Sequence, residues 1–329
     1  MDFDLTEDQK EIKNVARELL SARSPWPKVR EAAEADAYDA ALWQEIVGLG
    51  WPGIAVGESH GGQGLGAVEL AVLLEELGYA CAATPFLATA TAAAAIQAGG
   101  TDGQRERWLP GLVAGELTAG IGTAELAVDG HGADVIVLVD DDGARLIAGA
   151  DAETELLRTI DSTRRFATVR GDGEPLNGDV ADRGRAAIAA EVVGISQRAL
   201  EMTLAYVKER KQFGVAVGSF QAVAHRCAQM LLHAESARST AYYAAWAADA
   251  EPSRLPEAAA LAAAAGATAA REVPASAIQA HGGIGFTWEA DVHWLYKRGE
   301  VDRALLGGVK RHHAVLARAA AQRVTVPAG

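Results

Sequence analysis

The second half of the chain carries a helical repeat of apolar residues that is long enough to dictate a helical core. Apolar side chains recur at alternating steps of four and three, at Ile188, Val192, Ile195, Ala199, Met202 and Tyr206. This spacing places them on one face of a helix of about seven turns. Similar segments extend over about 219–250, 256–280 and 304–323. Four long helices with short connections predict an antiparallel four-helix bundle over residues 181–329.

The chain before this bundle begins with helical patterns. Thr6 and Gln9 have the spacing of a capping box, and apolar residues then recur at helical intervals. A second helix is expected over 40–47, where Gly48 follows as a stop signal. We predict an N-terminal helical domain over residues 1–116.

A short β-rich stretch separates the two helical parts. Apolar runs at 134–139 and 144–148 flank an acidic turn at 140–143, which predicts a β-hairpin, and 165–169 supplies a further strand. We therefore predict a mainly α protein with a small, reduced β-domain over residues 117–180.

Composition excludes several functional classes. The 30 Lys and Arg residues face 44 Asp and Glu residues, so the formal net charge is −14, which opposes nucleic-acid binding. Cys81 and Cys227 are the only cysteines, too few for a disulfide framework or a thiolate metal site. We expect no metal centre.

The start of the chain lacks a secretory pattern and its Ala-rich runs are interrupted by polar residues, so we expect a cytoplasmic protein without a membrane span.

Two clusters in the bundle region have the composition of ligand sites. RKQFG, at 210–214, could be a plain helix end whose basic residues face the negative end of the helix dipole. QAHGGIG, at 279–285, could be a plain turn. Its glycines would also let the backbone lie against a pyrophosphate with its N–H groups directed at the oxygens. Either interpretation is open from these residues alone.

Taken with their surroundings, these motifs resemble those of the acyl-CoA dehydrogenases. The resemblance rests on DFDLTEDQ, GWPGIAVGESHGGQGLG with the following EELG, RKQFG with SFQAVAHRCAQM, and QAHGGIGFTWEADVHW. It implies a helical N-terminal domain, a β-domain and a C-terminal four-helix bundle. The short β-region makes the chain similar to the short, beta-type subunits of actinobacterial heteromeric acyl-CoA dehydrogenases, which act on bulky steroid side-chain thioesters.

The resemblance also implies a cofactor, FAD, and the residues that hold it. The positions that match the family's FAD segments are Arg210, Gln212, Phe213, Gly214, Gln221, Gln279, Gly282 and Gly283. In the family these contacts reach a flavin housed by the neighbouring subunit. The chain is thus expected to form a homo-oligomer, or a hetero-oligomer with a longer paralogous subunit.

The chain departs from the family where the catalytic base belongs. Counting from the double glycine places the usual glutamate at Leu306, and the position used by a smaller subset of the family is Gly184. Neither can accept a proton. Glu300 and Asp302 are weak candidates for a displaced base, against an alternative of ordinary surface acids. For Glu191, inside an apolar helix face, a paired structural acid is the main interpretation and a functional acid the alternative.

Three functions follow from the resemblance. The chain is expected to belong to an FAD-dependent dehydrogenase that introduces an α,β double bond into an acyl-CoA and passes electrons to an electron-transfer flavoprotein. It could instead be a catalytically silent subunit that completes the FAD site of its partner. A flavoprotein oxidase or monooxygenase is the third alternative. In the family, segments of the β-domain form a wall beside the flavin ring, and one of them contains a tryptophan. Here Thr123-Ala124-Glu125 matches such a segment only in part, and no tryptophan lies between Trp108 and Trp246.

Overall fold

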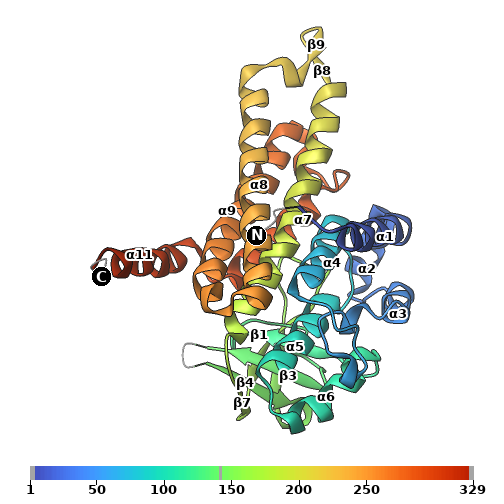
Figure 1. The fold of residues 1–329 in the computed structure, drawn as a ribbon. Helices are drawn as coiled ribbons and strands as arrows, with labels where there is room; N and C mark the ends of the chain where they lie inside the picture. The colour runs from blue at the N-terminus through green and yellow to red at the C-terminus, as the bar shows by residue number, and fades with distance from the viewer. Residues whose placement is uncertain (1–3, 141–142, 326–329) are drawn as a thin grey trace.

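The computed structural model describes residues 4–140 and 143–325. A small sheet lies at one end of the molecule, and the N-terminal helices pack beside the lower part of a long helical bundle (Figure 1). The bundle extends well beyond them and ends in a hairpin. The predicted architecture, mainly α with a small β-domain, is confirmed. Within the described residues, no helix combines the length and the apolar character that crossing a membrane requires.

The N-terminal part contains six α-helices. They are α1 (Glu7–Arg23), α2 (Trp26–Ala35), α3 (Ala40–Gly48), α4 (Ala67–Ala80), α5 (Phe86–Gly99) and α6 (Asp102–Val113). The predicted capping box is present, since the Thr6 hydroxyl accepts from the Gln9 backbone N–H at 3.2 Å and the Gln9 side chain accepts from the Thr6 N–H at 3.0 Å. The expected helix over 40–47 is α3. The sequence reasoning did not predict α2.

The sheet has seven strands, ordered β5-β6-β2-β1-β3-β4-β7. Their bounds are β1 (Ala119–Gly122), β2 (Ala127–Val128), β3 (Val135–Val139), β4 (Ala144–Ala148), β5 (Glu153–Leu157), β6 (Phe166–Arg170) and β7 (Glu174–Leu176). Only β1 and β3 pair in parallel. The predicted strands at 134–139 and 144–148 are β3 and β4, which pair antiparallel. Asp141 and Asp142 of the predicted turn lie outside the described residues.

The C-terminal part differs from the prediction in its last helix. It contains α7 (Val180–Glu209), α8 (Gln221–Ala250), α9 (Leu255–His281), α10 (Val292–Leu305) and α11 (Val309–Thr325). A single helix over 304–323 was wrong, because Gly307 and Gly308 adopt φ angles of 79° and 78° and end the helical path between α10 and α11. The fourth helix of the bundle is α10, which packs against α7 and α9. α11 packs against α9 and projects to one side of the bundle in Figure 1.

Two glycines let α4 and α7 touch through their backbones. A Cβ atom on Gly194 would lie 1.8 Å from the carbonyl oxygen of Glu75, and one on Gly78 would lie 2.2 Å from that of Glu191. No larger residue fits at either position without separating the helices. This contact fixes the N-terminal helices on the bundle.

The acidic pair that precedes Gly78 adds ionic contacts between the same parts. Glu75 and Glu76 are both 1% exposed. Lys13, on α1, reaches Glu75 at 2.8 Å and Glu76 at 3.1 Å, and Arg17 also pairs with Glu76. From α8, Arg238 pairs with Glu75. The EELG motif therefore ties three helices together.

A second group of buried charges lies where the sheet, α7 and α10 meet. Arg164, just before β6, pairs with Asp161 at 2.8 Å, with Glu191 of α7 at 2.7 Å and with Asp302 of α10 at 2.6 Å. Arg298 of α10 lies 3.4 Å from Glu191. We call these five residues the buried ion cluster. It confirms the interpretation of Glu191 as a paired structural acid.

The charges of the buried ion cluster balance when one carboxyl holds a proton. Burial opposes ionisation of Asp161, but Arg164 and Arg298 outweigh it and lower the pKa of that carboxyl. Burial raises the pKa of Asp302 well above its usual range, and Arg164 only partly offsets this. The shift therefore favours Asp302 as the carboxyl that would hold this proton.

Replacing Arg164 with methionine should strongly destabilise the fold. The change leaves buried carboxylates without their shared partner, a loss of about 3–5 kcal/mol in the free energy of unfolding. Urea unfolding measures this loss, with Arg158→Met, an exposed arginine after β5, as the control. Equal stability of the two variants would show that the cluster does not hold the domains together.

Candidate functional site

The RKQFG motif forms an exposed hairpin at the far end of the bundle (Figure 1). It joins α7 to α8 through two short strands, β8 (Lys211–Gln212) and β9 (Val215–Ala216). Phe213 and Gly214 form the two-residue loop, with φ angles of 51° and 81°. Two successive positive φ angles are typical of a tight hairpin turn, and glycine accommodates them readily. Phe213 is 94% exposed, and its ring makes only an edge contact with that of Phe220 within the described residues.

The QAHGGIG motif forms the end of α9 and the turn after it. Gly282 has a φ of 66°, which ends the helix, and a short 3-10 turn follows over Gly282–Phe286. A Cβ atom on Gly283 would meet no other atom within 4 Å, so the backbone is open on that side. Phe286 and Trp288 are 74% and 71% exposed. Exposed aromatic side chains next to an open glycine backbone are typical of a contact surface.

These two motifs meet at the same end of the bundle. The ring of Tyr206, one turn before the end of α7, stacks on that of His281, the last residue of α9, with centroids 4.4 Å apart. The His281 Nδ1 donates to the carbonyl of Ala277 at 2.7 Å, and burial lowers the pKa of this histidine. A neutral ring held in this way is a packing residue.

All eight residues predicted to hold FAD are exposed on this surface. We call them the clamp residues; they are Arg210, Gln212, Phe213, Gly214, Gln221, Gln279, Gly282 and Gly283. A guanidinium, two carboxamides and open glycine backbone suit an anionic dinucleotide. The residues present therefore fit the ADP part of FAD, lying on a surface that a second subunit could cover.

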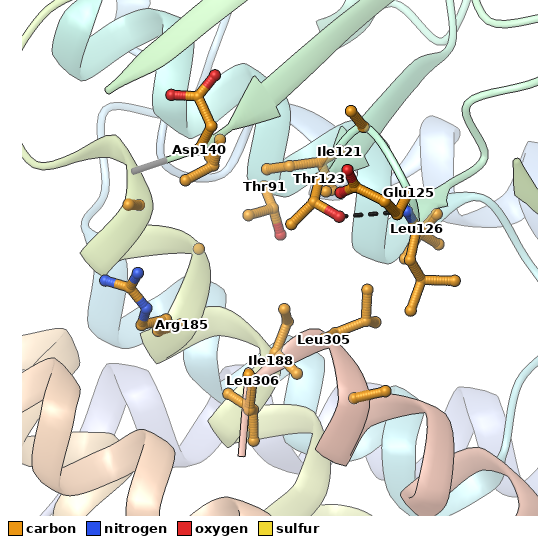
Figure 2. Close-up of a pocket in the computed structure, with 18 of the residues that line it drawn as sticks. Thr91, Ile121, Thr123, Glu125, Leu126, Asp140, Arg185, Ile188, Leu305 and Leu306 are labelled. Carbon is orange, nitrogen blue, oxygen red and sulfur yellow. Dashed lines mark hydrogen bonds between the residues drawn. The ribbon is translucent and has the colours of Figure 1, made fainter. Parts of the chain in front are cut away.

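A separate cavity of about 520 Å³ lies between the sheet and the bundle. Its walls come from α5, β1, the loop after β1, α7 and the α10–α11 junction (Figure 2). Most of the lining is apolar, including Leu126, Ile188 and Leu305. The size is that of an ordinary small-molecule pocket.

Both positions at which the family carries its base line this cavity. Leu306, 1% exposed at the end of α10, and Gly184, on α7, supply no carboxylate to it. Among the described residues, Glu125 and Asp140 are the acidic ones on its wall, and Asp140 pairs with Arg145. Glu125 is exposed, on the loop after β1.

The two weak candidates for a displaced base lie elsewhere. Glu300 pairs with Arg271 and Arg303, each at 3.0 Å. Asp302 is fully buried in the buried ion cluster. Neither is among the residues that line the cavity.

The sequence reasoning missed Thr91 and Arg164. Thr91, on α5, lines the cavity with a hydroxyl that has no partner among the described residues. Arg164 lies in DSTRR, a polar run between two strands, and this local signal could have indicated a structural turn. No local pattern marks Thr91, because its neighbours in the sequence form an ordinary Ala- and Thr-rich helix.

Comparison with known families matches both helical parts. Residues 6–116 match the model of the acyl-CoA dehydrogenase N-terminal domain, and 171–321 match that of the C-terminal domain. These stretches contain all the clamp residues and both positions at which a base is missing.

Similar proteins extend over nearly the whole chain. Acyl-CoA dehydrogenase IpdE2 of Mycolicibacterium smegmatis is 32% identical, covering 92% of this chain and 96% of the relative. Acyl-CoA dehydrogenase FadE34 of Mycobacterium tuberculosis is 33% identical over 85% of this chain and 42% of its own length. Among solved structures, the steroid acyl-CoA dehydrogenase Tcur3481-Tcur3483, as its G363A variant, has 26% identity and a TM-score of 0.89, covering 97% of this chain and 99% of the other.

These similarities confirm the resemblance predicted from the motifs. They also confirm FAD as the cofactor, since members of the family carry it. The chain belongs to the acyl-CoA dehydrogenase family.

Proposed function

We propose that this chain is the non-catalytic subunit of a heteromeric acyl-CoA dehydrogenase. It holds the ADP part of FAD through the clamp residues, while a longer paralogous partner supplies the wall of the flavin ring and the base. The assembly dehydrogenates a bulky acyl-CoA thioester, and an electron-transfer flavoprotein takes the electrons. One observation carries this proposal: all clamp residues are exposed at one end of the bundle, whereas Gly184 and Leu306 leave the family's two base positions in the cavity without a carboxylate.

The chemistry divides accordingly between the two subunits. When bound, FAD supplies the hydride-accepting chemistry of the reaction. Arg210 offers two parallel N–H donors to the pyrophosphate, and Gly283 lets the backbone approach it. With Leu306 and Gly184 at the base positions, this chain does not accept the α-proton of the thioester, which passes to the partner's base.

The charge of the chain makes local cations important. A net charge of −14 repels FAD and acyl-CoA at long range. Arg210 and Lys211 bring positive charge to the hairpin, where the diphosphate would lie. The solved steroid acyl-CoA dehydrogenase whose name joins two proteins, Tcur3481 and Tcur3483, supports both the mixed assembly and a bulky substrate.

A self-sufficient dehydrogenase is a second candidate. It is favoured by Glu125, a carboxylate that lines the cavity although it lies away from the family's base positions. A base must come within hydrogen-bond reach of the proton that it removes, and Glu125, on the exposed loop after β1, meets this requirement only for a ligand bound beside that loop.

The purified chain alone should be colourless and inactive with acyl-CoA. Mixing it with the partner subunit and FAD should give a yellow complex that acyl-CoA bleaches, because only the complex contains a base and a complete flavin site. Visible absorption measures both states. A yellow preparation of the chain alone that bleaches with acyl-CoA would favour the second candidate instead.

Replacing Arg210 with alanine should weaken FAD retention by the native complex about 10- to 100-fold, the usual effect of losing hydrogen bonds from a charged group. Flavin content after dialysis of the complex measures the change. Arg170→Ala, which removes an exposed arginine at the end of β6, should leave retention unchanged. Full flavin occupancy in Arg210→Ala would contradict the clamp.

Replacing Gly283 with valine should separate folding from cofactor binding. A side chain there meets nothing in this chain, so stability should hold, but it should obstruct the approaching diphosphate. The matched control is Gly103→Val on α6, which is also exposed with open space beside it. If the Gly283→Val complex keeps its flavin, the QAHGGIG motif is only a turn.

A further inference from the structure

We propose that Tyr38 and Asp129 form a proton-operated latch, which is closed while the Asp129 carboxyl holds a proton and loosens when this carboxyl ionises. The latch joins the turn after β2 to the loop between α2 and α3, and therefore joins the sheet to the N-terminal helices. The proposal goes beyond the proposed function and does not depend on it, because the latch lies within one chain.

The contact between Tyr38 and Asp129 brings together three segments that are distant in the sequence. The Tyr38 hydroxyl donates to the Asp129 carboxyl and accepts from the backbone N–H of Arg165 at 3.2 Å. The backbone N–H of Asp129 donates to the carbonyl of Arg165 at 2.9 Å. The Arg165 guanidinium lies over the Tyr38 ring, 4.4 Å from its centroid, and donates to the carbonyl of Asp36 at 2.6 Å. One tyrosine side chain thus holds the turn after β2 and the start of β6.

The backbone at Asp129 has a conformation that needs such support. Its φ of 54° lies in the left-handed region, which residues other than glycine adopt rarely and keep where surrounding contacts hold them. The next residue, Gly130, lies directly against β1, since a Cβ atom on Gly120 would be 2.7 Å from the Gly130 Cα. The residue before, Val128, lines the cavity. A movement of this turn is therefore passed to β1 and to the cavity wall.

The charged groups around Asp129 compensate its burial only in part. Asp129 is 8% exposed, and burial opposes its ionisation. The hydrogen bond from Tyr38 and the positive charges of Arg164, Arg165 and Arg298 favour ionisation. Arg164 and Arg298 pair with other carboxyl groups in the buried ion cluster, and Arg165 donates to a backbone carbonyl. Burial prevails and raises the pKa of Asp129 to about 7.

The latch therefore changes state near neutral pH. Burial and the neighbouring Asp129 raise the pKa of Tyr38 well above its usual range, so the tyrosine keeps its proton and remains a donor. For Asp129 the pKa rises from an ordinary value of 3.8 to about 7 in the folded chain. Its contribution to stability is therefore complete below the lower value and is lost as the pH rises through the higher one. Above that pH, the carboxylate gains hydration when the turn moves away from Tyr38.

Carboxyl-carbon NMR of the full-length chain tests the titration directly. The Asp129 resonance, assigned through its backbone neighbours, should titrate with a midpoint near pH 7. Tyr38→Phe removes a hydrogen bond that favours the carboxylate, so the midpoint should move upward in this variant. An Asp129 midpoint near its ordinary value, or the same midpoint in Tyr38→Phe as in the wild-type chain, would overturn the proposal.

Urea unfolding tests whether this proton is linked to folding. The unfolding equilibrium constant of the wild-type chain, divided by that of Asp129→Asn, should rise about tenfold per pH unit between about pH 5 and 7 and then level off, because one proton is released on unfolding. The matched control is Asp172→Asn, which removes an exposed carboxyl after β6 and should keep the wild-type profile. A ratio that does not change with pH would contradict the latch.

Hydrogen exchange locates the movement. Peptides that cover 36–39 and 126–131 should exchange about tenfold faster in the wild-type chain than in Asp129→Asn at pH 8, about one unit above the midpoint, and equally fast in both at pH 5. Peptides from α9 should exchange alike in the two proteins at both pH values. Equal exchange of the 36–39 and 126–131 peptides at pH 8 would show that ionisation of Asp129 does not loosen this contact.

Discussion

The structure depends on the buried ion cluster, in which two guanidinium groups and three carboxyl groups join the sheet to the bundle. Charges in an apolar interior must be paired, so each residue of the cluster fixes the elements that carry the others. One residue of the cluster, Asp302, also contacts the cavity wall through its backbone. The backbone N–H of Leu306 donates to the carbonyl of Asp302 at 2.9 Å, so Leu306, which lines the cavity, lies one helical turn from the cluster.

The molecule keeps its two ligand-related regions apart. The clamp residues lie at the exposed end of α7, α8 and α9, and the cavity lies at the opposite end against the sheet (Figure 1). The clamp residues are exposed, and the family's two base positions in the cavity, Gly184 and Leu306, carry no carboxylate.

Much of the fold was predictable because its causes are local. Helical periodicity located α7, α8 and α9, and β-branched runs around an acidic turn located β3 and β4. The prediction failed where two successive glycines break a helical pattern that was taken as continuous. Gly307 and Gly308 interrupt an otherwise helical stretch, so α10 and α11 take different directions, and α11 packs against α9. The short helix α2 was also not predicted, since it lacks a long apolar repeat.

The sequence by itself determined the family, the cofactor, the clamp motifs and the absence of a base at two positions, because residue types at fixed spacing carry this information. Only the tertiary structure decided that Leu306 and Gly184 face one cavity and that the Thr91 hydroxyl remains unpaired in its wall. Pairings such as Arg164 with Asp302 join residues 138 positions apart. Such contacts leave no local pattern, because their stability comes from burial, and burial exists only once the chain has folded.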